Sequence, residues 1–224
     1  LIIIKKDIFD MKKTLLTLVT SLFLFAQANA EMAVGVTANM AKLDTSGTHT
    51  LRTTNVLTKT SHTEDVVVPE IFFELLGDMG AIGVAYVPVQ ELGSKSRTDT
   101  NSEADTGTYT AKAELDSHVL FYADLNLMEI ANQQFYLKGG INHATLVTLE
   151  NLNSGSTYDN DEVWGTTVGL GVRGDVYGSY FYKLEGTFTK YDTYEDSSEN
   201  ATTANKVVAD TEVTSVKVSV GYKF

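Results

Sequence analysis

The sequence contains no cysteine and only two prolines among its 224 residues. The lack of cysteine excludes disulfide frameworks, thiolate metal sites and cysteine nucleophiles. Basic side chains are also few, 17 against 29 acidic ones, and the net charge of −12 disfavours a nucleic-acid partner because phosphate binding needs a basic face. Beyond residue 31 no apolar run approaches the roughly 20 residues of a membrane helix. Any insertion of that part into a membrane therefore has to use β-strands.

The N-terminal residues have the composition of an export signal. Two lysines follow Met11, and the apolar run behind them leads to Ala28-Asn29-Ala30, the small-x-small pattern of signal-peptidase cleavage. We expect residues 1–10 to be an upstream translation artefact, 11–30 a signal peptide and 31–224 the mature domain. Removing residues 1–30 takes away four lysines and two aspartates, which changes the net charge from −12 to −14.

The last stretch, residues 213–224, alternates without a break between apolar and polar side chains. One parity carries Val216, Val218, Val220, Tyr222 and Phe224, and the other carries serine, lysine and glycine. A period of two predicts a β-strand with one apolar face and one polar face. In a membrane barrel, an aromatic residue at the end of such a strand lies at the bilayer boundary.

Seven earlier segments show the same alternation. Together the eight predicted strands cover residues 32–42, 66–76, 81–91, 109–127, 135–149, 164–173, 180–191 and 213–224. Three short connections alternate with four long polar loops, at residues 43–65, 92–108, 150–161 and 192–211. An even strand count places both ends of this domain and all short connections on one side, which is the layout of outer-membrane barrels. We therefore predict an all-β fold, an eight-stranded antiparallel up-and-down transmembrane β-barrel, and expect a monomer.

Prolines and aromatic residues fit this arrangement. Pro69 and Pro88 fall near the external rim, where a residue without an N–H is tolerated. Trp164 falls near the external boundary, and the periplasmic boundary is predicted to carry Phe135, Tyr180, Tyr182, Tyr222 and Phe224.

The topology, the alternation and the terminal Val218-x-Val220-x-Tyr222-x-Phe224 pattern resemble the small outer-membrane β-barrels of the OmpA/OmpX type. The resemblance covers residues 31–224. It implies location in a bacterial outer membrane, contact with membrane lipids and lipopolysaccharide, and recognition of Tyr222 and Phe224 by the barrel-assembly machinery. Because the sequence ends at the barrel, unlike full-length OmpA-type proteins, we expect no peptidoglycan anchor.

The inward parity of the predicted strands carries charge. An eight-stranded barrel is just wide enough for side chains to fill its interior, and an unpaired charge there costs several kcal/mol. We therefore predict a charge plug formed by Glu74, Asp124, Lys138, Arg173, Lys183, Glu185 and Lys223. Neighbouring strands should bring Asp124 near Lys138, and Arg173 near Glu185. The alternative is a narrow ion path along the same polar column.

Enzymatic activity is a weaker hypothesis. Outer-membrane palmitoyltransferases, deacylases and omptin-type proteases use a histidine with a serine or carboxylates, and the four histidines here are His49, His62, His118 and His143. None lies in a pattern that matches those enzymes. His118 and Asp116 share the inward parity and could form an acid–base pair, but a buried structural histidine is the simpler interpretation. We expect no catalytic residues, no metal and no cofactor.

The long external loops are rich in Thr, Ser, Asn and Asp, and loops of this kind commonly carry binding functions. The sequence therefore predicts a non-enzymatic outer-membrane barrel with a structural or surface-interaction role, whose external ligand it does not identify. A narrow porin-like diffusion channel is the alternative, and a lipid-modifying enzyme is less favoured. The charged inward face also disfavours a lumen for hydrophobic ligands.

Overall fold

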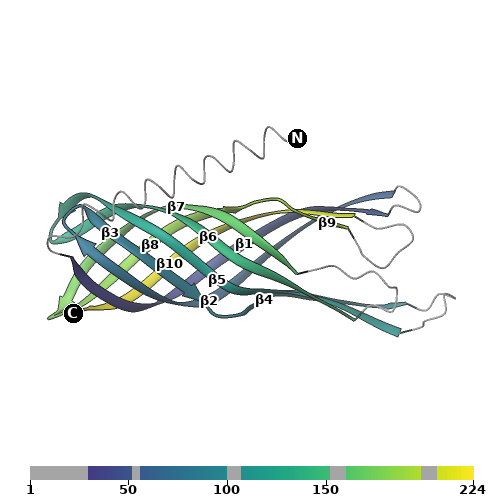
Figure 1. Ribbon diagram of the computed structural model, residues 1–224, viewed down its shortest axis with the longest axis horizontal. Helices are drawn as coiled ribbons and strands as arrows, with labels where there is room; N and C mark the ends of the chain where they lie inside the picture. Colours follow the sequence, from purple (N-terminus) through teal and green to yellow (C-terminus); the bar gives the residue numbers. More distant parts are fainter. Residues whose placement is uncertain (1–29, 52–55, 100–106, 152–159, 198–205) are drawn as a thin grey trace.

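The computed structural model describes residues 30–51, 56–99, 107–151, 160–197 and 206–224, which form ten β-strands (Figure 1). The strands are β1 Glu31–Leu51, β2 Val56–Gly77, β3 Gly80–Val87, β4 Gln90–Asp99, β5 Gly107–Ile130, β6 Gln133–Asn151, β7 Asp161–Tyr177, β8 Tyr180–Tyr191, β9 Tyr194–Ser197 and β10 Lys206–Lys223. Every pairing between them is antiparallel, and no helix among the described residues is long and apolar enough to cross a membrane.

The sheet closes into a barrel with eight strand positions, as predicted. β1 pairs with β2 on one side and with β10 on the other, from Ala33–Lys223 to Thr50–Lys206. β3 and β4 both pair with β5, and β8 and β9 both pair with β10, so each of these two pairs of strands fills one position. Closure leaves no unpaired edge in this part of the wall, which a membrane core requires because lipid offers no hydrogen bonds.

The predicted alternation is present in the barrel wall. Outward apolar side chains remain uncovered by protein, for example Leu170 at 62% and Val36 at 61% exposure, whereas the inward Thr37 is 6% exposed. A continuous exterior of this kind is the lipid-facing surface of a transmembrane barrel.

Aromatic residues mark the two boundaries of the apolar exterior. At the end with the short turns, the rings of Tyr180 and Tyr222 meet edge to face at 5.1 Å. Towards the other end, the rings of His143 and Trp164 lie 4.5 Å apart. Such girdles form where a barrel passes through the two membrane interfaces.

Three tight turns lie at the same end of the barrel as Glu31 and Phe224. They fall at Asp78–Met79, Ala131–Asn132 and Gly178–Ser179, within or next to the predicted short connections. Short turns at the end that holds both strand termini are typical of the periplasmic side of an outer-membrane barrel. The opposite end is therefore the external one, and it lies away from the C-terminus in Figure 1.

At the external end the barrel divides into two sheets, seen as diverging prongs in Figure 1. One, the outer β1 sheet, consists of β9, β10, β1 and β2; the other, the outer β5 sheet, consists of β4, β5 and β6. No backbone pairing joins β2 to β4, or β9 to β6 or β7, within the described ranges. The ladder between β2 and β3 ends at Ile71–Tyr86, just before Pro69 and Pro88. Prolines lack the N–H that would continue it.

The prediction of long polar loops was wrong for most of residues 43–65 and 92–108 and for half of residues 192–211, where strands continue. The loop predicted at residues 150–161 lies mostly outside the described residues. These segments are rich in threonine on both faces, so the apolar–polar contrast that marks a strand is missing. Threonine is nevertheless a good strand residue and pairs across strands: Thr45 and Thr211 are register partners with hydroxyls 3.3 Å apart.

Candidate functional site

Six charged side chains fill the lumen in the periplasmic half of the barrel. Three are acidic and three are basic: Glu74, Asp124 and Glu185 against Lys138, Arg173 and Lys183. We call this group the charge plug. Glu74 is 0% exposed and Lys183 is 1% exposed, so these two charges are shielded from solvent.

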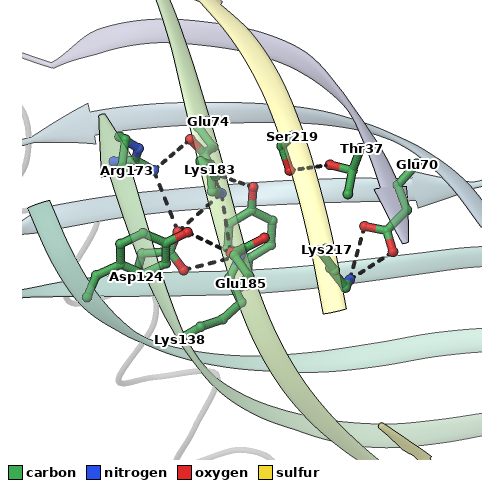
Figure 2. Close-up of polar contacts among 12 residues, drawn as sticks. Thr37, Glu70, Glu74, Asp124, Lys138, Arg173, Lys183, Glu185, Lys217 and Ser219 are labelled. Atoms are coloured by element: carbon green, nitrogen blue, oxygen red, sulfur yellow. Dashed lines mark hydrogen bonds and ion pairs between the residues drawn. The ribbon is translucent and has the colours of Figure 1, made fainter. Parts of the chain in front are cut away.

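The members of the plug meet across the lumen, as well as between neighbouring strands (Figure 2). The Lys183 ammonium bonds Glu74 on β2 and lies 3.4 Å from Asp124 Oδ2 on β5. Arg173 Nη2 on β7 is 2.9 Å from Glu74 Oε2 and 3.6 Å from Asp124 Oδ2. These bonds connect opposite walls, so the plug obstructs the lumen.

Lys138 completes the network from β6. Its Nζ lies 2.7 Å from Glu185 Oε1 and 3.3 Å from Asp124 Oδ1. Two tyrosines donate to the carboxylate oxygens that the lysines also contact: Tyr122 Oη donates to Glu74 Oε1 at 2.7 Å, and Tyr136 Oη donates to Glu185 Oε1 at 2.9 Å. Every acid in the plug thus has at least one basic partner.

Aromatic rings pack the plug against the wall. Lys138 Nζ lies 3.6 Å from the centre of the Tyr122 ring, a cation–π contact. The ring of Tyr136 lies over Gly171 on β7, where an added Cβ would come within 2.4 Å of its Cζ. Glycine at this inward position therefore makes room for an aromatic ring.

The balance of charge decides whether such a group is tolerated. Each buried ion loses several kcal/mol of hydration, and only close, hydrogen-bonded partners offset that loss. Three positive and three negative groups leave no net charge in the plug. Removing one member would leave another charge uncompensated.

A second ion pair lies nearer the external end. Lys217 Nζ on β10 contacts both carboxylate oxygens of Glu70 on β2, at 2.8 and 3.0 Å, and Asn39 Nδ2 on β1 donates to Glu70 at 2.7 Å. This pair was not predicted from the sequence. Both residues have the inward parity, but they sit two strands apart, and only the register across β1 brings them together.

Hydroxyl groups extend the polar filling between the plug and the Glu70–Lys217 pair. The hydroxyls of Thr37 and Ser219 are 2.8 Å apart, joining β1 to β10 (Figure 2). On the other side Asn142 Nδ2 donates to Thr167 at 2.6 Å. These short contacts continue the obstruction along the lumen.

Two details of the predicted plug differ in the structure. Lys223 lies apart from the six residues and pairs with Asp175 at 2.7 Å near the periplasmic rim. Arg173 is the register partner of Lys183 and bonds Glu74 and Asp124, so the expected approach to Glu185 is replaced by contacts across the lumen. The expected approach of Asp124 to Lys138 is present.

His118 and Asp116, which share the inward parity in the sequence, do not form a pair in the structure. Ser117 has φ 53° and forms a β-bulge, so one extra residue stands between Asp116 and Val119 on β5. A bulge reverses the parity of the residues before it. Asp116 is thereby paired with Thr145, whereas His118 Nε2 lies inside, 3.1 Å from Asn142 Oδ1 and 3.2 Å from Tyr191 Oη.

The other histidines lie in separate surroundings. His143 faces outward as predicted, with Nε2 3.5 Å from Glu162, and His62 lies 3.6 Å from Glu64 in the outer β1 sheet. The side chain of His49 lies outside the described residues. In the part of the chain that the structure describes, no three His, Asp or Glu side chains are grouped closely enough to hold a metal ion.

A cavity of about 420 Å³ opens above His118, between the two outer sheets. Its walls are mainly apolar, with side chains from both sheets and from β7 and β8: Ala41, Leu43, Val66, Leu115, Leu146, Val163, Tyr191, Val207, Ala209 and Val213. The expectation that the inward face is charged therefore applies to the membrane-spanning half, and the external half has an apolar interior.

Comparisons with known proteins bear on the fold. No protein-family model and no curated protein matches the chain. Among solved structures, Neisserial surface protein A is 11% identical, with a TM-score of 0.50, over 86% of this chain and 97% of its own. The outer membrane protein AlkL is 7% identical over 88% and 90% (TM-score 0.48), and the outer membrane protease OmpT of Escherichia coli 11% over 87% and 97% (TM-score 0.47).

The first of these similarities shows the fold of a small outer-membrane barrel. Together with the closed wall and the apolar exterior, it places this chain across a bacterial outer membrane.

Proposed function

We propose that this protein is a closed outer-membrane barrel that conducts no ions and acts through its external end as a surface-interaction protein. The observation that carries the proposal is the charge-balanced plug, in which Lys183 and Arg173 bond Glu74 across the lumen. A diffusion channel needs a continuous water path, and breaking this network to open one would expose buried unpaired charges.

The external end offers the surface for interaction. The two outer sheets carry the strands beyond the boundary marked by Trp164. Exposed ion pairs towards this end include Lys190 on β8 with Glu212 on β10 at 2.9 Å, and Lys42 with Asp44 on β1 at 3.6 Å. Lysines at this level suit contact with lipopolysaccharide phosphates, and the acidic side chains suit bridging by divalent cations. Membrane lipids surround the apolar belt below.

We also propose a role in assembly for the aromatic residues at the C-terminal end of β10. Tyr222 and Phe224 face outward at the periplasmic boundary, and Phe224 N donates to Met32 O at 2.9 Å. We assign these two aromatic residues as the signal read by the barrel-assembly machinery, with residues 11–30 as the export signal and the mature chain beginning at residue 31.

Shortening the outer β1 sheet tests the surface role. Ser46 and Ser61 are paired, so residues 47–60 can be replaced by Asn-Gly, which forms a two-residue hairpin turn. We expect cells with the shortened protein to lose adhesion or phage sensitivity while the barrel still shows heat-modifiable migration on gels. Unchanged adhesion, phage sensitivity and lipopolysaccharide binding in this variant and in one with the β4–β5 hairpin shortened would contradict a surface role.

A further inference from the structure

The cavity between the two outer sheets has the dimensions of a ligand site. Its volume of about 420 Å³ lies within the range of roughly 300–1,000 Å³ found for small-molecule pockets. Packed sheets normally interdigitate their side chains and leave few voids larger than a water molecule. Here the facing walls carry small residues such as Ala41 and Ala209, which leave the space open.

The bulge at Ser117 contributes to this wall. By alternation alone Leu115 would face outward, but the extra residue in β5 turns it inward, where it pairs with Leu146 and lines the cavity. The local irregularity therefore adds apolar surface to an interior that stands above the membrane boundary. An apolar cavity of this kind favours an apolar guest over water.

The ionisable groups that line the cavity limit the chemical class of ligand that can bind there. The ionisable residues found there are Glu64, Glu91, Asp192, His62 and His118. The Lys217 ammonium below is held by Glu70. An anionic guest would be repelled by these carboxylates and would lose the hydration of its charge among the apolar walls, whereas an uncharged molecule would not.

We propose that the cavity between the outer β1 and β5 sheets binds a small, uncharged apolar molecule that arrives from outside the cell. The molecule packs among Leu43, Val66, Leu115, Leu146 and Val163, with His118 and Tyr191 at the floor. This inference deepens the proposed surface role and rests on it, because the plug and the Glu70–Lys217 pair close the lumen below the site.

Photolabelling the full chain in phosphatidylcholine vesicles tests the proposal. Benzophenone is small, apolar and uncharged, and on illumination it inserts into nearby C–H bonds; 4-benzoylbenzoate adds a carboxylate to the same framework. We expect benzophenone to label Leu115, Leu146 and Val163 in a saturable way, and the lipid-facing Val216 and Val218 without saturation. We expect 4-benzoylbenzoate to label the cavity residues at least ten-fold less.

Substitutions that fill the cavity can be compared with a control substitution on the lipid-facing side. Ala209→Phe and Val66→Phe each place a ring in the space and should lower cavity labelling about ten-fold while labelling of the lipid-facing residues stays constant. Ala38→Phe, which faces lipid, is the control and should leave cavity labelling unchanged. Gel migration checks that each variant folds, and the comparison of the two probes on the unaltered chain decides the matter even if neither filled variant folds.

Three results would overturn the inference: labelling confined to the lipid-facing residues, cavity labelling that persists in folded filled variants, or equal labelling by the anionic probe. Photolabelling is measured on the unaltered chain, whereas the surface role is tested in cells that carry the shortened variants, so the two proposals fail independently.

Discussion

Lys217 on β10 reaches past β1 to the carboxylate of Glu70 on β2, and its ammonium lies 2.8 and 3.0 Å from the two oxygens. The two residues stand 147 positions apart in the chain. Their contact exists only because β1 and β10 close the barrel in one register. Stability should therefore depend on the pair as a unit.

Breaking this pair should be costly, and neutralising both partners should not. Lys217→Met leaves the Glu70 carboxylate buried without its cation and should lower the free energy of unfolding by about 3–5 kcal/mol. Adding Glu70→Gln, which keeps an acceptor for Asn39, should recover most of that loss. Urea titrations in lipid vesicles measure both. A double variant that loses as much as the two single variants combined would refute the coupling.

The charge plug should show the same behaviour more strongly at Lys183. This ammonium bonds Glu74 and lies near Asp124 and Glu185, so Lys183→Met should destabilise the barrel by about 3–5 kcal/mol or prevent folding. The matched control is Lys190→Met, which removes an exposed lysine from the same strand and should leave the unfolding curve unchanged. Equal effects at the two positions would show that the plug does not stabilise the fold.

Gly171 should be intolerant of a side chain. A valine there would collide with the Tyr136 ring and displace its hydroxyl from Glu185, at a cost of about 1–3 kcal/mol for overpacking. Gly186→Val is the control, because its Cβ would meet no atom within 4 Å on the lipid-facing side. The same urea titration compares them, and a Gly171→Val barrel as stable as Gly186→Val would argue against the packing described.

Replacing Phe224 should separate assembly of the barrel in the cell from the intrinsic ability of the chain to fold. Phe224→Ser should reduce the amount of barrel in the outer membrane of cells several-fold, while refolding of the purified chain into vesicles proceeds as before. Phe188→Ser, at another lipid-facing aromatic position, should not show that difference. If refolding falls in parallel with the cellular amount, Phe224 acts through stability and not as a recognition signal.

The sequence predicted the contacts that alternation and neighbouring strands determine. Asp124 and Lys138 share the inward parity on adjacent strands, so their approach followed directly. The bonds of Arg173 and Lys183 to Glu74 cross the lumen, and they depend on the stagger of the closed barrel, which parity does not reveal.

One inserted residue and the polar outer strands account for the features that were not predicted from the sequence. The only sign in the alternation is Ser117 itself, a polar residue on the apolar parity, yet that one residue moves Asp116 away from His118 and turns Leu115 inward. The threonine-rich outer segments lack the apolar–polar contrast of a lipid-facing wall. Their strands, and the cavity between them, therefore became visible only in three dimensions.

Planar-bilayer conductance tests the central claim, that the charge plug closes the lumen. The refolded chain should show no stable open steps at moderate voltage. A variant in which Glu70, Glu74, Asp124, Lys138, Lys183 and Lys217 are all serine loses three charges of each sign, stays neutral inside, and should conduct. Stable open steps in the unaltered protein, equal to those of the serine variant, would contradict the account.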